Sequence, residues 1–323
     1  MSARNEHQVL IENKIKEKIK EMPQIITDYF YSLEDKTAET KYTYIMHVIS
    51  FFEYLSEDGI DVNNISELAN IKTSYMNKYM NNTKYKDEEK KQEYSYTYRI
   101  AKMAAISCLF EMLNDDGYMD NNPCDKVKIK NTTEEKDIIA LTPKEYKIIE
   151  KNIRNNSRYP WVYRDLAIFN LGCTTGLRIQ ELIEIDLEDI DLMDGIMTIV
   201  GKGNVKRKIY LSEKTISYLE NWIEEREDIM ENNSGALFIS NRKTRLSKTP
   251  IRNMIEKNSE CIGKHISPHK MRATCATNLY NKTGDIYLTQ QTLGHKNIST
   301  TKRYAKIDEE KRKNAATVLG KLF

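Results

Sequence analysis

The sequence contains no run of apolar residues long enough to cross a membrane. A spanning helix needs about 18 such residues in a row, and no stretch of this chain approaches that length. The segment from Met1 to Lys20 is also too polar for a secretory signal peptide. We therefore expect a cytoplasmic protein that does not enter a membrane.

Cysteine is scarce and scattered, with five residues in 323 and no C-x-x-C pair. An odd number of dispersed cysteines argues against a disulfide framework and against a cysteine-based zinc site. This usage is typical of the reducing cytosol. We interpret these residues as buried or chemically idle thiols: Cys108, Cys124, Cys173, Cys261 and Cys275.

A net excess of either charge is also missing. The chain carries 50 Lys and Arg against 48 Asp and Glu, which gives a net charge of +2. Total charge therefore does not point to a nucleic-acid partner, although a nearly neutral protein can still present one basic face. The hydrophobic content of 40% is enough to build sizeable cores, and 323 residues are more than one core normally organises, which favours two domains.

The first third of the chain has the periodicity of helices. Residues 1–20 form either a charged amphipathic helix or a flexible arm, and we treat them as an N-terminal extension. Helical spacing of apolar residues begins at Thr37, and a long helix at 94–113 carries apolar residues on more than one side. The charged stretch 84–93 predicts a solvated loop or an exposed helix. Residues 21–120 are thus predicted to form a helical domain.

A polar segment at 121–137 is predicted to link this domain to a second one at 138–306. The second domain begins with a capping box at Thr142-Pro143-Lys144-Glu145. Asp194-Gly195 predicts a hairpin among short strands, after which helices return. The expected fold is therefore mainly α with a small antiparallel β-sheet, and residues 307–323 are predicted to be a C-terminal tail.

Two motifs of the second domain place charged side chains beside glycine turns. Arg178 follows Gly176 at a helix start, and Glu181 lies at i+3 on the same face, where it can orient the guanidinium group. Lys202 lies between Gly201 and Gly203 in a hairpin loop, where glycines permit close approach of the backbone to a ligand.

Two further motifs follow. Ser267-Pro268 supplies the N-cap and first residue of a helix, so His269 and Arg272 lie on one face, at a helix end that favours phosphate. His295 follows Gly294 and precedes a newly capped helix that carries Tyr304.

These residue types meet the demands of a metal-free attack on a DNA phosphodiester. Arginines neutralise the phosphate oxygens that gain charge in the transition state. A nucleophile must be delivered in line, and an acid must protonate the departing sugar oxygen. Each motif alone occurs often by chance, so the interpretation depends on six roles being filled together.

In this order the residues resemble the tyrosine recombinase (phage integrase) family, and the chain length resembles its Xer-like and mobile-element members. The resemblance extends from Thr37 to the C-terminus and is strongest at 174–184, 200–211, 267–272 and 293–304. It implies a helical core-binding domain followed by an α+β catalytic domain. One departure is visible: many Xer-like members have a histidine directly after the second arginine, where this chain has Ala273.

The resemblance assigns the central chemical roles to four residues. Arg178 and Arg272 correspond to the phosphate-clamping arginines, Lys202 to the hairpin lysine that acts as general acid, and Tyr304 to the nucleophile. The implied enzyme is a site-specific DNA recombinase or integrase that works through a 3′-phosphotyrosyl intermediate. Because this intermediate keeps the bond energy, no nucleotide cofactor is expected. The resemblance implies no metal ion either.

Three more residues receive supporting roles from the resemblance. His269 is assigned to proton transfer or phosphate bonding, and His295 to a hydrogen bond with the scissile phosphate. Glu181 matches the acidic residue that supports the first arginine.

The implied partners are double-stranded DNA with inverted-repeat core sites and further copies of the chain in a tetrameric synapse, with the tail docked on a neighbouring subunit. The protein would then be associated with the nucleoid. Whether an accessory protein or a second recombinase takes part is left open. The candidate DNA contacts are Thr40, Lys41, Tyr42, Arg99 and Lys102 on the helical domain, and Lys206 and Arg207 after the hairpin loop.

Two other functions fit part of this pattern. A DNA-relaxing enzyme of the type IB topoisomerase kind uses the same chemistry, but the Xer-like length and motifs argue against it. A catalytically silent DNA-binding regulator needs no catalytic set, and the presence of all six residues argues against it.

Overall fold

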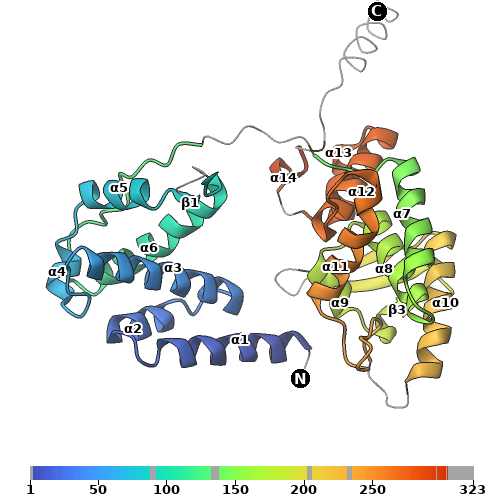
Figure 1. Cartoon of the computed structure of the whole chain (residues 1–323), viewed down its shortest axis with the longest axis horizontal. Helices are drawn as coiled ribbons and strands as arrows, with labels where there is room; N and C mark the ends of the chain where they lie inside the picture. Colours follow the sequence, from blue (N-terminus) through green and yellow to red (C-terminus); the bar gives the residue numbers. More distant parts are fainter. Residues whose placement is uncertain are drawn as a thin grey trace, which may run out of the picture. The chain divides into compact units, whose positions relative to one another are not determined.

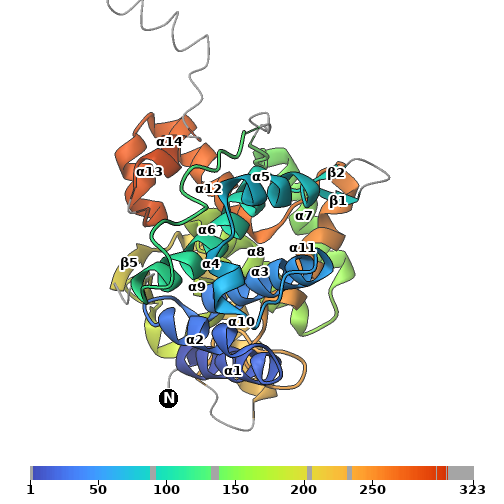
Figure 2. The same ribbon diagram turned by 90° about the vertical axis from the view of Figure 1, so that its left-hand side faces the viewer.

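The computed structural model describes residues 3–87, 92–131, 138–201, 206–230, 235–295, 297–302 and 304. It divides into two compact units, Met1–Lys136 and Asp137–Phe323, each with its own hydrophobic core (Figures 1 and 2). Helices dominate, and the sheets are small and antiparallel. The predicted fold class is therefore confirmed. Of the described helices, none combines the length and apolarity needed to span a bilayer.

The first unit is a helical bundle around α3 and α6. These two helices pack against each other, and residues such as Val48 and Phe110 are completely buried between the helices of this unit. Its described elements are α1 (Ala3–Ile19), α2 (Gln24–Ser32), α3 (Ala38–Glu57), α4 (Ile65–Ala69), α5 (Thr73–Asn82), β1 (Tyr85–Asp87), β2 (Gln92–Glu93) and α6 (Tyr96–Asp115).

The N-terminal segment forms a helix that packs along α3 (Figure 1). Ile15 and Ile19 are buried in the core of the first unit. Lys41 on α3 forms an ion pair of 3.4 Å with Glu12 on α1. The structure therefore selects the helix, one of the two alternatives that the sequence left open.

The charged stretch 84–93 contains two short paired strands, which differs from the predicted loop or helix. Strands β1 and β2 pair antiparallel with Tyr85 opposite Glu93. Lys84 lies 2.7 Å from Glu93 in an ion pair. Opposite charges beside the ladder thus stabilise a pairing that the uniform polarity of the stretch concealed.

The second unit is built around α8, with α7, α10 and α12 packed against it (Figure 1). Apolar residues occur on all sides of α8, which is why this helix is buried along most of its length. The described elements are α7 (Pro143–Asn156), α8 (Trp161–Thr175), α9 (Ile179–Glu184), η1 (Leu187–Asp189), β3 (Ile190–Asp191), β4 (Ile196–Val200), β5 (Lys206–Tyr210), α10 (Glu213–Ile229), α11 (Lys248–Ser259), η2 (Glu260–Ile262), α12 (Pro268–Thr283), α13 (Ile286–Leu293) and α14 (Ser299–Lys302).

Local signals in the sequence set the ends of these elements. The Thr142 side chain accepts from the backbone of Glu145, whose carboxylate accepts from the backbone of Thr142, so the predicted capping box is present. Gly195 has a φ of 63° in the predicted hairpin, which joins β3 to β4. The three strands lie in the order β3-β4-β5, all antiparallel.

Candidate active site

Arg178 is held at the start of α9 by the carboxylate of Glu181. Its backbone N–H donates to Glu181 Oε2 and its Nη1 donates to Glu181 Oε1, each over 2.8 Å. Gly176 precedes it with a φ of 63°, and a Cβ at this glycine would lie 2.7 Å from Leu293 Cδ2. A glycine is therefore needed where the chain turns toward Arg178, whose side chain is 41% exposed.

Glu181 is buried but remains an anion at neutral pH. Burial alone would raise its pKa, since it disfavours the charged form. The hydrogen bond from the backbone of Arg178, the contacts with Arg207 and the charge of Arg178 outweigh this effect. The pKa of Glu181 consequently lies below its ordinary value.

Arg207 on β5 is the second partner of Glu181. Its Nη1 donates to Oε1 over 3.2 Å and its Nη2 donates to Oε2 over 3.1 Å. The same guanidinium group covers Gly294, where a Cβ would lie 2.5 Å from Nη1. The sequence predicts a DNA contact for this arginine, but the structure gives it a partner within the protein. Its neighbour Lys206 is exposed, and a DNA contact there stays a prediction.

Arg272 on α12 ties two turns together. It is buried, and it donates to the carbonyl of Gly176 over 2.5 Å and to that of Leu293 over 2.7 Å. Burial, followed by the positive charge of Arg178, lowers the pKa of Arg272 to about 10. The guanidinium group is therefore still protonated at neutral pH, and its position is fixed by backbone atoms.

His295 lies in the turn after α13 and is neutral at pH 7. Its Nδ1 is 2.9 Å from Thr301 Oγ1, and Gln290 Nε2 donates to its carbonyl over 2.9 Å. Burial, followed by the charge of Arg272, lowers the pKa of His295 to about 4. Neither Thr301 nor Gln290 is predicted from the sequence, because a threonine and a glutamine on helices form no motif.

Tyr304 lies beside His295, with the two ring centroids 6.5 Å apart and the ring planes inclined by 14°. It is buried against Ala273, Ala276 and Leu293. Its hydroxyl is also close enough to Arg272 to influence the pKa of that guanidinium group. The second unit thus brings the predicted nucleophile together with one predicted arginine and one predicted histidine.

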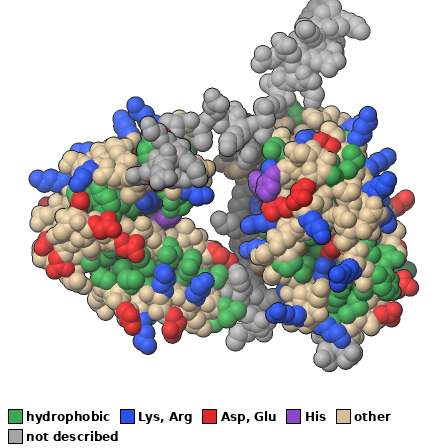
Figure 3. Space-filling view, in the orientation of Figure 1, with side chains coloured by type: hydrophobic (Ala, Val, Ile, Leu, Met, Phe, Trp, Pro, Cys, Tyr) green, Lys and Arg blue, Asp and Glu red, His purple; other side chains and the backbone are tan. Residues whose placement is uncertain are grey.

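The structure says less about two other predicted site residues, His269 and Lys202. His269 is exposed on the first turn of α12, near enough to His295 to contribute to its lowered pKa. Lys202 lies outside the described residues, and Val200 pairs with Lys206 on either side of it. Figure 3 shows histidine and basic side chains close together on one face of the second unit. Residues 307–323, the predicted tail, are also outside the described part.

The predicted DNA contacts of the first unit are more enclosed than expected. Arg99 is 8% and Lys102 4% exposed, and Lys102 Nζ lies over the Tyr79 ring, 4.5 Å from its centroid. Burial lowers the pKa of Lys102 to about 8. Tyr42 packs against the core. A phosphate contact requires an accessible cation. The low exposure of Arg99 and Lys102 therefore gives no support to their DNA contacts, which stay predictions.

Thr40 and Lys41 on α3 are partly buried. Thr40 Oγ1 lies 3.0 Å from Thr37 Oγ1, and Lys41 lies over the Phe30 ring as well as near Glu12. Both side chains thus have partners within the first unit, and their DNA contacts stay predictions.

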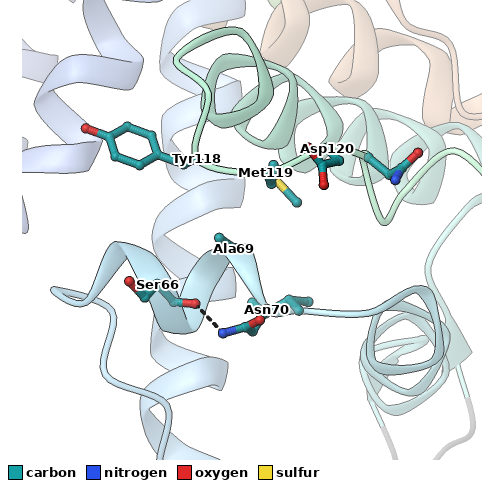
Figure 4. Close-up of a pocket in the computed structure, with 8 residues that line it drawn as sticks. Ser66, Ala69, Asn70, Tyr118, Met119 and Asp120 are labelled. Carbon is teal, nitrogen blue, oxygen red and sulfur yellow. Dashed lines mark hydrogen bonds between the residues drawn. The ribbon is translucent and has the colours of Figure 1, made fainter.

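A pocket of about 400 Å³ lies between α4 and the chain that follows α6 in the first unit (Figure 4). Tyr118, Met119 and Asp120 line one side, and on the other Asn70 Nδ2 donates to the carbonyl of Ser66 over 2.8 Å. The residues that line it include none of the predicted site residues.

Comparisons with known proteins agree with one another. The family model described as the phage integrase family matches residues 140–311. Over 211 residues the chain is 29% identical to tyrosine recombinase XerC of Vibrio vulnificus (strain YJ016). The aligned part is 64% of this chain and 65% of that protein. Over 307 residues it is 28% identical to XerC of Caldanaerobacter subterraneus subsp. tengcongensis, covering 89% of this chain and 83% of that one.

Solved structures share the fold. The XerH site-specific recombinase bound to difH substrate matches with a TM-score of 0.69 and 22% identity, covering 88% of this chain and 81% of that chain. A lambda integrase dimer bound to a COC′ core site matches with a TM-score of 0.66 and 19% identity, covering 88% and 94%.

Proposed function

Because this chain belongs to the phage integrase family, we propose that it is a site-specific DNA recombinase that cuts and rejoins double-stranded DNA. The observation that carries the proposal is the convergence of Arg178, Arg272, His295 and Tyr304 in the second unit. These four residues come from distant parts of the sequence, so it is the fold that brings them together. The DNA-bound relatives of similar fold support DNA as the partner.

In the proposed reaction the Tyr304 hydroxyl gives up its proton, which His269 can accept as the proposed proton-transfer group, and its oxygen attacks a phosphorus atom of the DNA backbone. The new bond is a 3′-phosphotyrosyl ester, and the bond from phosphorus to the 5′ oxygen of the next nucleotide breaks. That oxygen takes up a proton and leaves as a hydroxyl, which later attacks the phosphotyrosine in the reverse step. One phosphate ester replaces another, so the proposal needs no ATP, and it assigns the neutralisation of the phosphate charge to the arginines and not to a metal ion.

The charge of the site suits a phosphate. Glu181 is the carboxylate that faces Arg178 and Arg207, and Arg272 lies close enough for its pKa to respond to all three. Among these four side chains, positive charge exceeds negative charge until an anion binds. For His295 we propose the tautomer in which the Thr301 hydroxyl donates to Nδ1, 2.9 Å away. The ring proton then lies on Nε2, where it can donate to a phosphate oxygen.

The contacts described above do not test the roles of the remaining residues. We propose Lys202 as the acid that protonates the leaving 5′ oxygen, and His269 as a phosphate-bonding or proton-transfer group. We further propose that the first unit binds duplex DNA together with the second, and that four copies assemble on paired inverted-repeat sites.

The test is formation of a covalent adduct. Duplexes that bind the protein would be selected from a random-sequence pool, nicked beside the cleavage point to trap the intermediate, and incubated in EDTA. The wild-type protein should form a denaturation-resistant adduct, and Tyr304→Phe should bind the duplex but form none. An adduct formed by Tyr304→Phe would refute the assignment of the nucleophile.

The same assay separates the other two functions. Site-independent relaxation of supercoiled DNA, without exchange between duplexes, would point to a topoisomerase-like enzyme. Specific binding without any adduct would point to a silent regulator.

A further inference from the structure

The carboxylate of Glu181 accepts four hydrogen bonds, two from each of two arginines. Oε1 accepts from Nη1 of both Arg178 and Arg207, and Oε2 accepts from the backbone N–H of Arg178 and from Nη2 of Arg207. A carboxylate has about four lone-pair sites for hydrogen bonds. Glu181 is therefore saturated, and Arg207 takes half of its capacity.

Arg178 consequently contacts Glu181 through a single guanidinium nitrogen. Arginine and carboxylate groups favour a two-point contact, and in this site Arg207 makes that contact. The exposure of the two side chains differs accordingly: 41% for Arg178 and 19% for Arg207. The two arginines thus differ in their surroundings: Arg207 faces the buried carboxylate with both terminal nitrogens, whereas Arg178 uses one of them and is the more exposed side chain.

The position of Arg207 also depends on a glycine beside His295. Gly294 has a φ of 63°, and a Cβ there would lie 2.5 Å from Arg207 Nη1 and 2.8 Å from its Cζ. The guanidinium group therefore packs directly on the backbone of this turn. One side chain on β5 contacts both the carboxylate that orients Arg178 and the turn that carries His295.

We propose that Arg207 is a positioning residue for the phosphate site. It restricts the hold of Glu181 on Arg178 to one guanidinium nitrogen, so that the rest of the Arg178 fork is free to meet a DNA phosphate. The proposal rests on the proposed function for its phosphate ligand. It gives Arg207 no contact with DNA, in contrast to the role that the sequence suggests.

The first test compares Arg207→Gln with Arg252→Gln, which removes the same charge from an exposed position on α11. Single-turnover cleavage of the nicked duplex at saturating protein should slow by roughly ten- to a hundredfold in Arg207→Gln, the size expected when a catalytic group is misplaced. Duplex affinity and its salt dependence should match those of the control. Weaker binding with a shallower salt slope would make Arg207 a DNA contact and overturn the proposal.

The second test asks whether Arg207 acts through Glu181. A neutral amide at position 181 holds Arg178 weakly, so Arg207→Gln should cost little additional rate in a Glu181→Gln background. If the double variant cleaves more slowly than the wild type by the product of the two single-variant factors, Arg207 acts independently of Glu181, as a purely structural residue would.

The third test needs no DNA, and it decides the proposal even if the wild-type protein forms no adduct. Without Arg207, Arg178 should gain a second contact with Glu181. Arg178→Gln should therefore lower the unfolding temperature more in an Arg207→Gln background than in the wild type. Equal falls in both backgrounds would overturn the proposal, whereas a missing wild-type adduct refutes only the recombinase function.

A conservative variant covers the case in which Arg207→Gln does not fold. Arg207→Lys keeps the positive charge, but an ammonium group lacks the planar fork that occupies both oxygens of Glu181. Glu181 is then free to make a second contact with Arg178, so single-turnover cleavage by Arg207→Lys should also be slower than that of the wild type. A wild-type cleavage rate in this variant would overturn the proposal, because charge alone would then suffice at this position.

Discussion

Three arginines of the second unit have the same charge and different surroundings. Arg272 is buried and donates to two backbone carbonyls, Arg207 faces a carboxylate, and Arg178 is partly exposed. An accessible guanidinium group can meet a ligand, while an enclosed one is fixed in place by the protein. The contribution of each arginine to catalysis and to stability should therefore differ.

Arg178→Ala and Arg272→Ala should each slow DNA cleavage by about a hundredfold or more, since each removes a charge that stabilises the transition state. Arg272→Ala should also lower the unfolding temperature, because the carbonyls of Gly176 and Leu293 lose their donor. Arg178→Ala should change it much less. Single-turnover cleavage and thermal unfolding measure the two effects. If either variant cleaves at the normal rate, the proposed contact of that arginine with the phosphate is wrong.

His295 should make the free energy of unfolding depend on pH. Its pKa is about 4 in the folded protein, and an unfolded histidine has a pKa of about 6.5. Between these values the unfolded chain binds a proton that the folded protein does not, so stability falls as the pH drops from roughly 6.5 to 4. His295→Gln should lose this part of the dependence. Urea titrations at pH 7, 5.5 and 4 measure the free energy of unfolding of the wild type and of His295→Gln. If this free energy changes with pH equally in both proteins, the lowered pKa of His295 is wrong.

The sequence identifies Arg178 and Arg272 more readily than it identifies the surroundings of Arg207. The first two lie beside a glycine turn and a helix start, which are local signals. Arg207 lies between two lysines on a strand, and successive side chains point to opposite faces. Lys206 and Arg207 therefore have different surroundings, and only the packing of α9 and of the turn at Gly294 against β5 shows which face is enclosed.

At the scale of helices and strands, features encoded within a few residues were predictable. The capping box at Thr142 and the hairpin at Asp194-Gly195 depend only on neighbouring residues, and both are present. The pairing of β1 with β2 is also local, but the uniform polarity of the stretch gave no strand pattern. The burial of Lys102 depends on packing against Tyr79 of another helix, so the local pattern could not reveal it.

The connection between β4 and β5 should supply the acid of the reaction. Lys202 lies in it, and its role can be tested with a substrate whose leaving 5′ oxygen is replaced by sulfur. A thiolate leaves without protonation far more easily than an alkoxide, so it needs little acid assistance. Lys202→Ala should cleave the ordinary duplex very slowly and the sulfur-containing duplex at close to the wild-type rate. Equal defects on both duplexes would mean that Lys202 only positions DNA.

At the scale of the whole molecule, each unit has its own core, and the described chain before residue 132 belongs to the first. Cys124 is buried in that core, and Asn122 Nδ2 donates to the carbonyl of Ser107 over 3.0 Å. The first part of the predicted linker at 121–137 is therefore packed. Its polarity concealed this because single side chains, such as Asn122, Cys124 and Val127, and not an apolar run, attach it to the first unit.

We propose that assembly on DNA depends on residues beyond Tyr304. In the sequence, Val318, Leu319, Leu322 and Phe323 recur at i, i+1, i+4 and i+5, which is the pattern of one apolar helix face. A short isolated helix is only marginally stable in water and cannot bury such a face alone. The face therefore packs either on its own unit or on a neighbouring copy, and we propose the neighbouring copy.

Deleting residues 318–323 should then separate binding from assembly. One copy should bind a single half-site with unchanged affinity, but the cooperative filling of paired half-sites should disappear. Cleavage should fall as well, because the segment lies at the end of the tail that follows Tyr304, and docking of this tail should help to set the position of Tyr304. Gel-shift titrations on single and paired half-sites measure the first two effects. Lys321→Ala, which lies outside the apolar face, serves as the control and should behave as the wild type. A truncated protein that fills paired sites cooperatively and recombines at the full rate would show that the segment does not dock on a neighbouring copy.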